Sequence, residues 1–396
     1  MNFAPWPFFE EDEIQAVVNV LKSGKINQWT GNEVNLFERE FAQYLGSDYA
    51  VALANGSLAL DLALIAFGIG NGDEVIVTPR SFMASVSCVP LRGAIPVFVD
   101  VDPVSQNITL ETIVNAVTPQ TKAIIAVHLG GWPCEVGKIK SFCEQKGIVL
   151  IEDCAQAHGA QYKGQKVGSF GDCSIFSFCQ DKIMTTGGEG GMLVTNNRRI
   201  WERAWSYKDH GKNYTKVFSE NNAPGFKWLI DSFGSNFRMT EMQAAIGRVM
   251  LRKLDKWVGK RREFAKLFDQ ELNKIPGLRT TIPEKDVYHA YYKYYVFLNL
   301  DELQDSWSRD RIIASLNKAG IPCNTGICPE IYREKAFETS VHKIHGASKK
   351  KADHYLPVAR QLGETSIVFM VHPTLSIESI HYTIKQMKLL MEKAVK

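Results

Sequence analysis

Several features that would direct a chain to a membrane or a metal are missing from this sequence. None of the eight cysteines forms a C-x-x-C pair and their spacings are irregular, so we expect reduced thiols and no metal site. No apolar run reaches the ~18–20 residues of a membrane span, and the longest, at 58–69, is broken by Asp61. The N-terminal residues carry an acidic cluster where a signal peptide needs basic and then apolar residues. We therefore expect a cytoplasmic protein without a membrane partner.

A strong charge imbalance is also missing. The 46 basic and 43 acidic residues leave a net charge of +3, and the densest basic stretches, at 259–262 and 348–351, are short. Nucleic-acid binding normally requires a basic patch or stripe, so the composition gives no reason to expect a nucleic-acid partner.

What the sequence does contain is a regular alternation of short apolar runs with helical patterns. β-Branched runs at 74–79, 95–102, 123–128 and 148–153 are separated by segments such as 135–147, whose apolar residues recur at helical spacing. Strands that alternate with helices predict a mainly parallel sheet covered by helices on both faces. Two further strands are predicted at 173–178 and 190–196.

A length of 396 residues exceeds one ordinary domain, and the pattern changes after about residue 240. One long helical stretch follows, then a strand at 291–300 and a helix at 308–321. We predict a large domain at 1–254 and a smaller C-terminal α/β domain at 255–396, with the N-terminal segment as a candidate to pack on the small domain.

Three features at predicted strand ends carry chemistry. The turn "NGS" at 55–57 opens a helix, whose free N–H groups favour an anion. Asp153 ends a buried strand, where a carboxylate needs a cationic or hydrogen-bonding partner. Lys182 lies in a turn before the glycine-rich stretch 187–191, and a desolvated lysine can form a Schiff base. Pyridoxal 5′-phosphate needs this set: donors for its phosphate, an acid for its ring nitrogen and a lysine for its aldehyde.

The sequence resembles the DegT/DnrJ/EryC1/StrS family of nucleotide-sugar aminotransferases, which have the aspartate-aminotransferase fold (fold type I). The resemblance covers almost the whole chain. It rests on several motifs in order, among them "EDCAQAHGA" (152–160), "GSFGDCSIFSF" (168–178), "DKIMTTGGEGGMLVTN" (181–196) and "GSNFRMTEMQAAIG" (234–247).

The resemblance implies a role for each of eight residues. Lys182 would hold pyridoxal 5′-phosphate and move the proton, and Asp153 would pair with the ring nitrogen. The remaining cofactor-binding residues would be Gly56, Ser57 and Ser177 at the phosphate, Phe82 stacked on the ring, Gln156 near the ring hydroxyl, and Asn236, reaching the phosphate of the neighbouring subunit of a homodimer. Phe82 as plain core, Ser177 as an inward strand residue and Gln156 as an ordinary turn residue remain open as structural alternatives.

The same resemblance implies the reaction. Lys182 favours transamination over dehydration, because a dehydrating branch of the family has histidine at this position. L-Glutamate would donate the amine to a nucleotide-linked keto sugar, with a UDP-linked 4-keto sugar and a surface polysaccharide (O-antigen or capsule) as the expected context. "MTTGGEGGM" favours C-4 over C-3 amination. The residues Cys179 and Gln180 and the stretch 325–332 depart from the family pattern and leave the substrate open. A dehydrase or elimination enzyme on the same fold, and a binding protein without activity, are the alternatives.

Overall fold

The computed structural model describes residues 1–219, 226–339 and 356–396. Its central sheet has seven strands in the order β1-β9-β8-β5-β4-β2-β3. All of these strands run parallel except β9, which pairs antiparallel with both of its neighbours. The predicted class, a mainly parallel mixed sheet between helices, is confirmed. The strands are β1 (Tyr49–Leu53), β2 (Glu74–Val77), β3 (Ile95–Phe98), β4 (Thr121–Val127), β5 (Val149–Asp153), β8 (Cys173–Ser177) and β9 (Gly191–Thr195).

Helices cover both faces of this sheet and form two separate apolar clusters. One face packs against α3 (Gly56–Phe67), α4 (Ala84–Leu91) and α7 (Arg198–Lys208). The other packs against α2 (Glu33–Leu45), α5 (Leu110–Val114), α6 (Val136–Lys146) and part of α9 (Glu241–Leu272). Because side chains alternate between the faces, each strand contributes to both clusters, as the near-continuous apolar runs predict.

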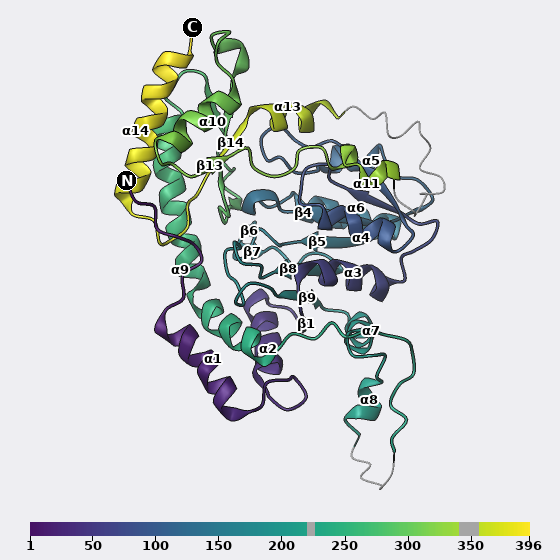
Figure 1. Cartoon of the computed structure of the whole chain (residues 1–396). Helices are drawn as coiled ribbons and strands as arrows, with labels where there is room; N and C mark the ends of the chain where they lie inside the picture. Colours follow the sequence, from purple (N-terminus) through teal and green to yellow (C-terminus); the bar gives the residue numbers. More distant parts are fainter. Residues whose placement is uncertain (220–225, 340–355) are drawn as a thin grey trace.

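A second sheet lies near the C-terminus. Four antiparallel strands in the order β10-β12-β14-β13 pack against the end of α9, α10 (Arg309–Lys318) and α14 (Ile377–Ala394). The strands are β10 (Leu278–Thr280), β12 (Tyr294–Leu298), β13 (Cys323–Asn324) and β14 (Ser366–Phe369). The boundary predicted at 254/255 falls inside α9, which runs from the large sheet to the small one (Figure 1). That division stays a prediction.

The short elements complete the chain. A three-stranded sheet joins β11 (Val287–Tyr288), β6 (Gln161–Tyr162) and β7 (Gln165–Lys166). The helix α1 (Glu11–Ser23) packs along α9, while α8 (Tyr214–Val217) lies on an arm that projects from the body (Figure 1). The remaining helices are α11 (Ala336–Thr339) and α13 (Pro357–Thr365), with single turns of 3-10 helix at Leu129–Gly131, Leu300–Glu302 and Ile331–Arg333. Within the described ranges, no helix combines the length and the apolar character needed to cross a membrane.

Candidate active site

A cavity of about 650 Å³ opens where β5 and β8 end, and we call it the sheet-end cavity. Ligands of open α/β sheets bind at the carboxyl ends of strands, so this is the expected position. Seven of the eight predicted site residues line it: Gly56, Ser57, Phe82, Asp153, Gln156, Ser177 and Lys182. Segments far apart in the chain therefore meet at one place.

Asp153 is the buried acid of this cavity. It ends β5, is 3% exposed, and accepts a hydrogen bond from the Ser85 hydroxyl at 2.7 Å and from the Ala155 N–H at 3.1 Å. Burial raises the pKa of the Asp153 carboxyl, while these two hydrogen bonds and the charge of Lys182 oppose that rise. The carboxyl group is thus fixed in orientation and favours a cationic or N–H partner in the cavity.

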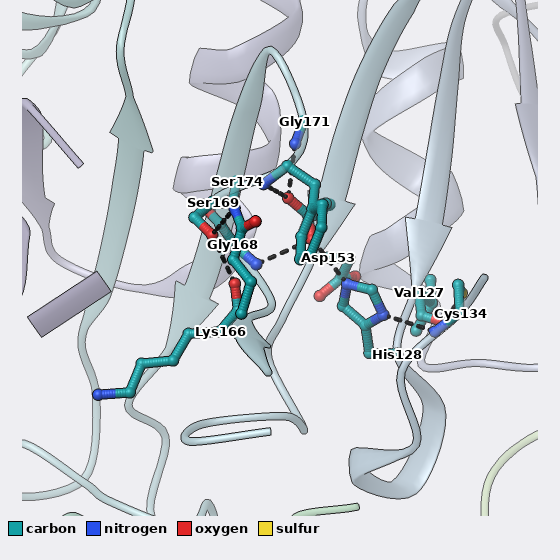
Figure 2. A network of polar contacts seen from close by, with 12 residues as sticks. Val127, His128, Cys134, Asp153, Lys166, Gly168, Ser169, Gly171 and Ser174 are labelled. Atoms are coloured by element: carbon teal, nitrogen blue, oxygen red, sulfur yellow. Dashed lines mark hydrogen bonds and ion pairs between the residues drawn. The ribbon is translucent and has the colours of Figure 1, made fainter. Parts of the chain in front are cut away.

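The residue before it, Glu152, faces the opposite side of the sheet. Its carboxylate accepts hydrogen bonds from the N–H groups of Gly168, Phe170 and Gly171, at 2.7–2.8 Å. His128 Nε2 lies 3.1 Å from Glu152 Oε2, and His128 Nδ1 accepts from the Cys134 N–H, so the neutral ring donates through Nε2. Figure 2 shows this network around the loop 166–171 and the end of β4. It holds β5 from behind the cavity.

Lys182 follows β8 in a tight turn, where its N–H donates to the Cys179 carbonyl at 3.1 Å. Its own carbonyl accepts from Trp6 Nε1 at 2.8 Å, and its Nζ lies 5.0 Å from the centroid of the Tyr292 ring. Burial lowers the pKa of the Lys182 amine, while the carboxylates of Asp181 and Asp153 oppose that decrease. An amine with a lowered pKa is more often neutral, and only the neutral amine is a nucleophile.

An anion cradle lies at the start of α3. Asn55 caps the helix by accepting from the Leu58 N–H at 2.9 Å, and the N–H groups of Gly56 and Ser57 have no partner among the described residues. A Cβ at Gly56 would lie 2.7 Å from Ser177 Cβ, so only glycine lets the helix approach β8 this closely. The helix N-terminus and the Ser177 hydroxyl therefore fit a phosphate group.

The two other predicted contacts take different forms. The Phe82 side chain is 62% exposed although it is a large aromatic, which removes the alternative that it is plain core. Gln156 is buried, and its Oε1 accepts from the Gly130 N–H at 2.8 Å, which orients the side chain at the cavity wall. A buried aromatic would have no free face, so Phe82 is suited to stack on a planar ring.

Asn236 is the one predicted residue that does not line the sheet-end cavity. It is exposed and forms an isolated β-bridge with Asp209, and its Oδ1 accepts from the Arg238 N–H at 3.4 Å. Its expected contact was with the cofactor of a neighbouring subunit, so its position in one chain does not test that role, which stays a prediction.

Sequence reasoning missed the residues on the far side of Lys182. Tyr292 and Lys293 line the cavity, the Tyr292 hydroxyl donates to Asp181 Oδ2, and Lys293 Nζ lies 3.5 Å from the same carboxylate. These two residues lie more than a hundred positions after Lys182, and no local pattern in the sequence predicts a contact over that separation. Ser85 was also missed, although its place one turn after the phenylalanine of "SFMAS" is a usable signal.

Comparison with known proteins shows which family the chain belongs to. The model of the DegT/DnrJ/EryC1/StrS aminotransferase family matches residues 7–388. The chain belongs to this family. It is 35% identical to the spore coat polysaccharide biosynthesis protein SpsC of Bacillus subtilis, over 80% of each chain. It is 33% identical to dTDP-4-dehydro-2,3,6-trideoxy-D-glucose 4-aminotransferase of Saccharopolyspora spinosa, over 93% of this chain and 91% of that protein.

Among solved structures, an aminotransferase from Psychrobacter cryohalolentis matches with a TM-score of 0.92 and 49% identity, over 97% of this chain and 98% of that one. The predicted family and fold type are confirmed. The protein is an aminotransferase, and its cofactor is pyridoxal 5′-phosphate. The sheet-end cavity contains the three groups that this cofactor needs: an amine, a buried carboxyl and an anion cradle.

Proposed function

We propose that the protein transfers an amino group from L-glutamate to the keto carbon of a nucleotide-linked sugar. The observation that carries the proposal is the shared cavity: the Lys182 amine, the Asp153 carboxyl and the α3 anion cradle all line one volume of about 650 Å³. A cavity of this size at the end of a parallel sheet is large enough for a cofactor and part of a sugar substrate.

In this proposal each residue of the chain has one task. Gly56, Ser57 and Ser177 bind the cofactor phosphate, and Phe82 stacks on the ring. Bound pyridoxal phosphate supplies an electron sink for the carbon that gains or loses the amine. Asp153 keeps a proton at the ring nitrogen, because its carboxylate stabilises a cationic N–H close to it.

Lys182 has two tasks. It would hold the cofactor through its Nζ, and its free amine would carry a proton to and from the substrate carbon as a general base and acid. The lowered pKa of its amine suits both tasks, since a larger share of the amine is then neutral and able to accept a proton. Gln156 lies near the ring hydroxyl, and Asn236 reaches the phosphate of the partner subunit in a homodimer.

For the acceptor we propose a 4-keto sugar on a nucleoside diphosphate, as a step towards a cell-surface polysaccharide. The names of the relatives support this choice: one is a 4-aminotransferase of a dTDP-linked 4-dehydro sugar, and another is a spore coat polysaccharide biosynthesis protein. UDP as the nucleotide stays a prediction, since the named sugar nucleotide carries dTDP. A C-3 keto sugar is the second candidate at the same site.

The test is a coupled incubation. Purified protein, pyridoxal phosphate and L-glutamate are combined with UDP-, GDP- or dTDP-linked 4-keto hexose, and 2-oxoglutarate and the amino sugar are measured by mass spectrometry. The proposal predicts equal amounts of the two products, with one nucleotide preferred. Loss of the sugar hydroxyl without 2-oxoglutarate would instead indicate a dehydrase on the same fold.

A further inference from the structure

A second cavity, of about 610 Å³, lies on the other side of the Lys182 turn, and we call it the N-terminal cavity. Residues 1–6 line one part of it and residues 320–322 and 370–372 line another. Asp181, Tyr292 and Lys293 line both this cavity and the sheet-end cavity. These three residues therefore lie between the N-terminal cavity and the sheet-end cavity, which contains Lys182.

Arg261 is the feature of the N-terminal cavity that needs a partner. It projects from α9 and is 1% exposed, and its Nη1 donates to the carbonyls of Tyr291 and Tyr292 at 3.3 and 3.0 Å. Its Nε and Nη2 are buried without a hydrogen-bond partner in the described part of the chain. Two donor nitrogens of a buried guanidinium are costly when unpaired, so this site favours an anionic acceptor.

The other charged side chains of the lining do not supply that acceptor. Asp181 is the only carboxylate among the described lining residues, and it already accepts from the Tyr292 hydroxyl and pairs with Lys293. His372 is neutral and adds no further positive charge, because burial and the neighbouring Arg261 lower its pKa to about 3. The cavity therefore has an excess of positive charge that no described side chain neutralises.

The rest of the lining selects for an apolar body. The Arg261 guanidinium carbon lies 5.3 Å from the centroid of the Trp6 ring. The remaining side chains are largely apolar: Phe3, Ile321, Pro322, Met370 and Val371. An inorganic anion would leave these surfaces in contact with water, whereas an organic acid would cover them.

We propose that the N-terminal cavity binds a small organic carboxylate, with its charged group at the Arg261 guanidinium and its apolar body against Trp6 and Met370. The site lies outside the sheet-end cavity, so its occupation does not depend on the proposed aminotransfer reaction. It is joined to that reaction centre through Trp6, whose Nε1 donates to the carbonyl of Lys182.

The test uses sodium benzoate as the probe in isothermal titration calorimetry on the full chain. We expect a dissociation constant on the order of 1 mM, since the ligand is small and makes one charged contact. Benzamide, the neutral isostere, and inorganic phosphate, which has no apolar body, should each bind about tenfold more weakly or not at all. Equal binding of benzamide or phosphate would overturn the proposal.

Two matched variants locate the site. Met370 and Ile327 are both half-buried, and each lines only one of the two cavities. Met370→Trp should abolish benzoate binding and Ile327→Trp should leave it unchanged. The opposite pattern would assign benzoate to the sheet-end cavity and overturn the proposal.

A third variant tests the anchor. Arg261→Lys keeps a cation but loses the planar pair of donors, so it should weaken benzoate binding by about tenfold while circular dichroism shows a folded protein. Unchanged binding in folded Arg261→Lys would also contradict the proposal.

Discussion

Glu152 and Asp153 are neighbours in sequence, are both buried carboxylates, and lie on opposite faces of the same strand. Glu152 accepts from three backbone N–H groups and from His128, all within the protein. Asp153 accepts from one hydroxyl and one N–H, and its remaining surface lines the sheet-end cavity. The comparison teaches that burial of an acid does not indicate function; what matters is whether the fold has already satisfied it.

The largest effect on activity is expected at Asp153, the carboxylate that lines the cavity. Asp153→Asn should reduce kcat/KM for aminotransfer by about 10²–10⁴-fold, because the amide cannot stabilise a charged N–H as a carboxylate does. The thermal midpoint should change little, since an amide fits the same space. Steady-state kinetics and differential scanning calorimetry measure both quantities, and a near-normal kcat/KM would contradict the role assigned to Asp153.

For Glu152, on the opposite face of the strand, we expect a loss of stability rather than a loss of activity. Glu152→Gln places the amide N–H groups of the new side chain against the backbone N–H groups that now donate to the carboxylate. Because this breaks a buried, paired site, we expect a loss of about 3–5 kcal/mol in the free energy of unfolding. Urea unfolding checks this, with the exposed Glu144→Gln as the control. Folded Glu152→Gln should keep most of its kcat/KM; a loss comparable to that of Asp153→Asn would erase the distinction between the faces.

A smaller effect is expected at Ser85, which donates to Asp153. Ser85→Ala removes one hydrogen bond to a charged group, so kcat/KM should fall by about tenfold. Ser87→Ala, on the same helix, is the matched control. If both variants lose activity equally, the loss reflects the packing of α4 rather than the hydrogen bond to Asp153.

The smallest expected effect is that of Asp181 on the pKa of the Lys182 amine. Asp181 raises the pKa of the Lys182 amine, so Asp181→Asn should lower that pKa and shift the titration of the amine to lower pH. The titration is followed in the cofactor-free protein by ¹³C NMR after reductive methylation of lysines, with the exposed Asp305→Asn as the control. An unchanged or raised Lys182 pKa would show that Asp181 does not act on the amine.

Sequence alone was sufficient for the wall of the cavity that the sheet builds. Asp153 ends one short apolar strand and the turn at Gly56 follows another, and parallel strands bring their carboxyl ends to one edge. Ser177 was placed at this edge through the family resemblance. Phe82 was predicted to stack on the cofactor ring only through the family resemblance, since an aromatic after a strand is usually core.

The opposite wall could not be predicted in this way. Tyr292 and Lys293 reach the cavity because α9 carries the chain back from the large sheet to the small one, and Trp6 reaches Lys182 from the N-terminal segment. These contacts depend on how the sheets and the N-terminal segment pack together, which no local periodicity encodes. The short strands β6, β7 and β11 were missed for the same reason: two residues give no alternation to detect.

The most direct test of the central claim, that Lys182 holds the cofactor, is chemical. The protein loaded with pyridoxal phosphate is reduced with sodium borohydride, which makes a Schiff base permanent, and its peptides are mapped by mass spectrometry. The account predicts the added phosphopyridoxyl mass on the peptide that contains Lys182, and its loss in Lys182→Ala. The same mass on another lysine, or on none, would contradict it.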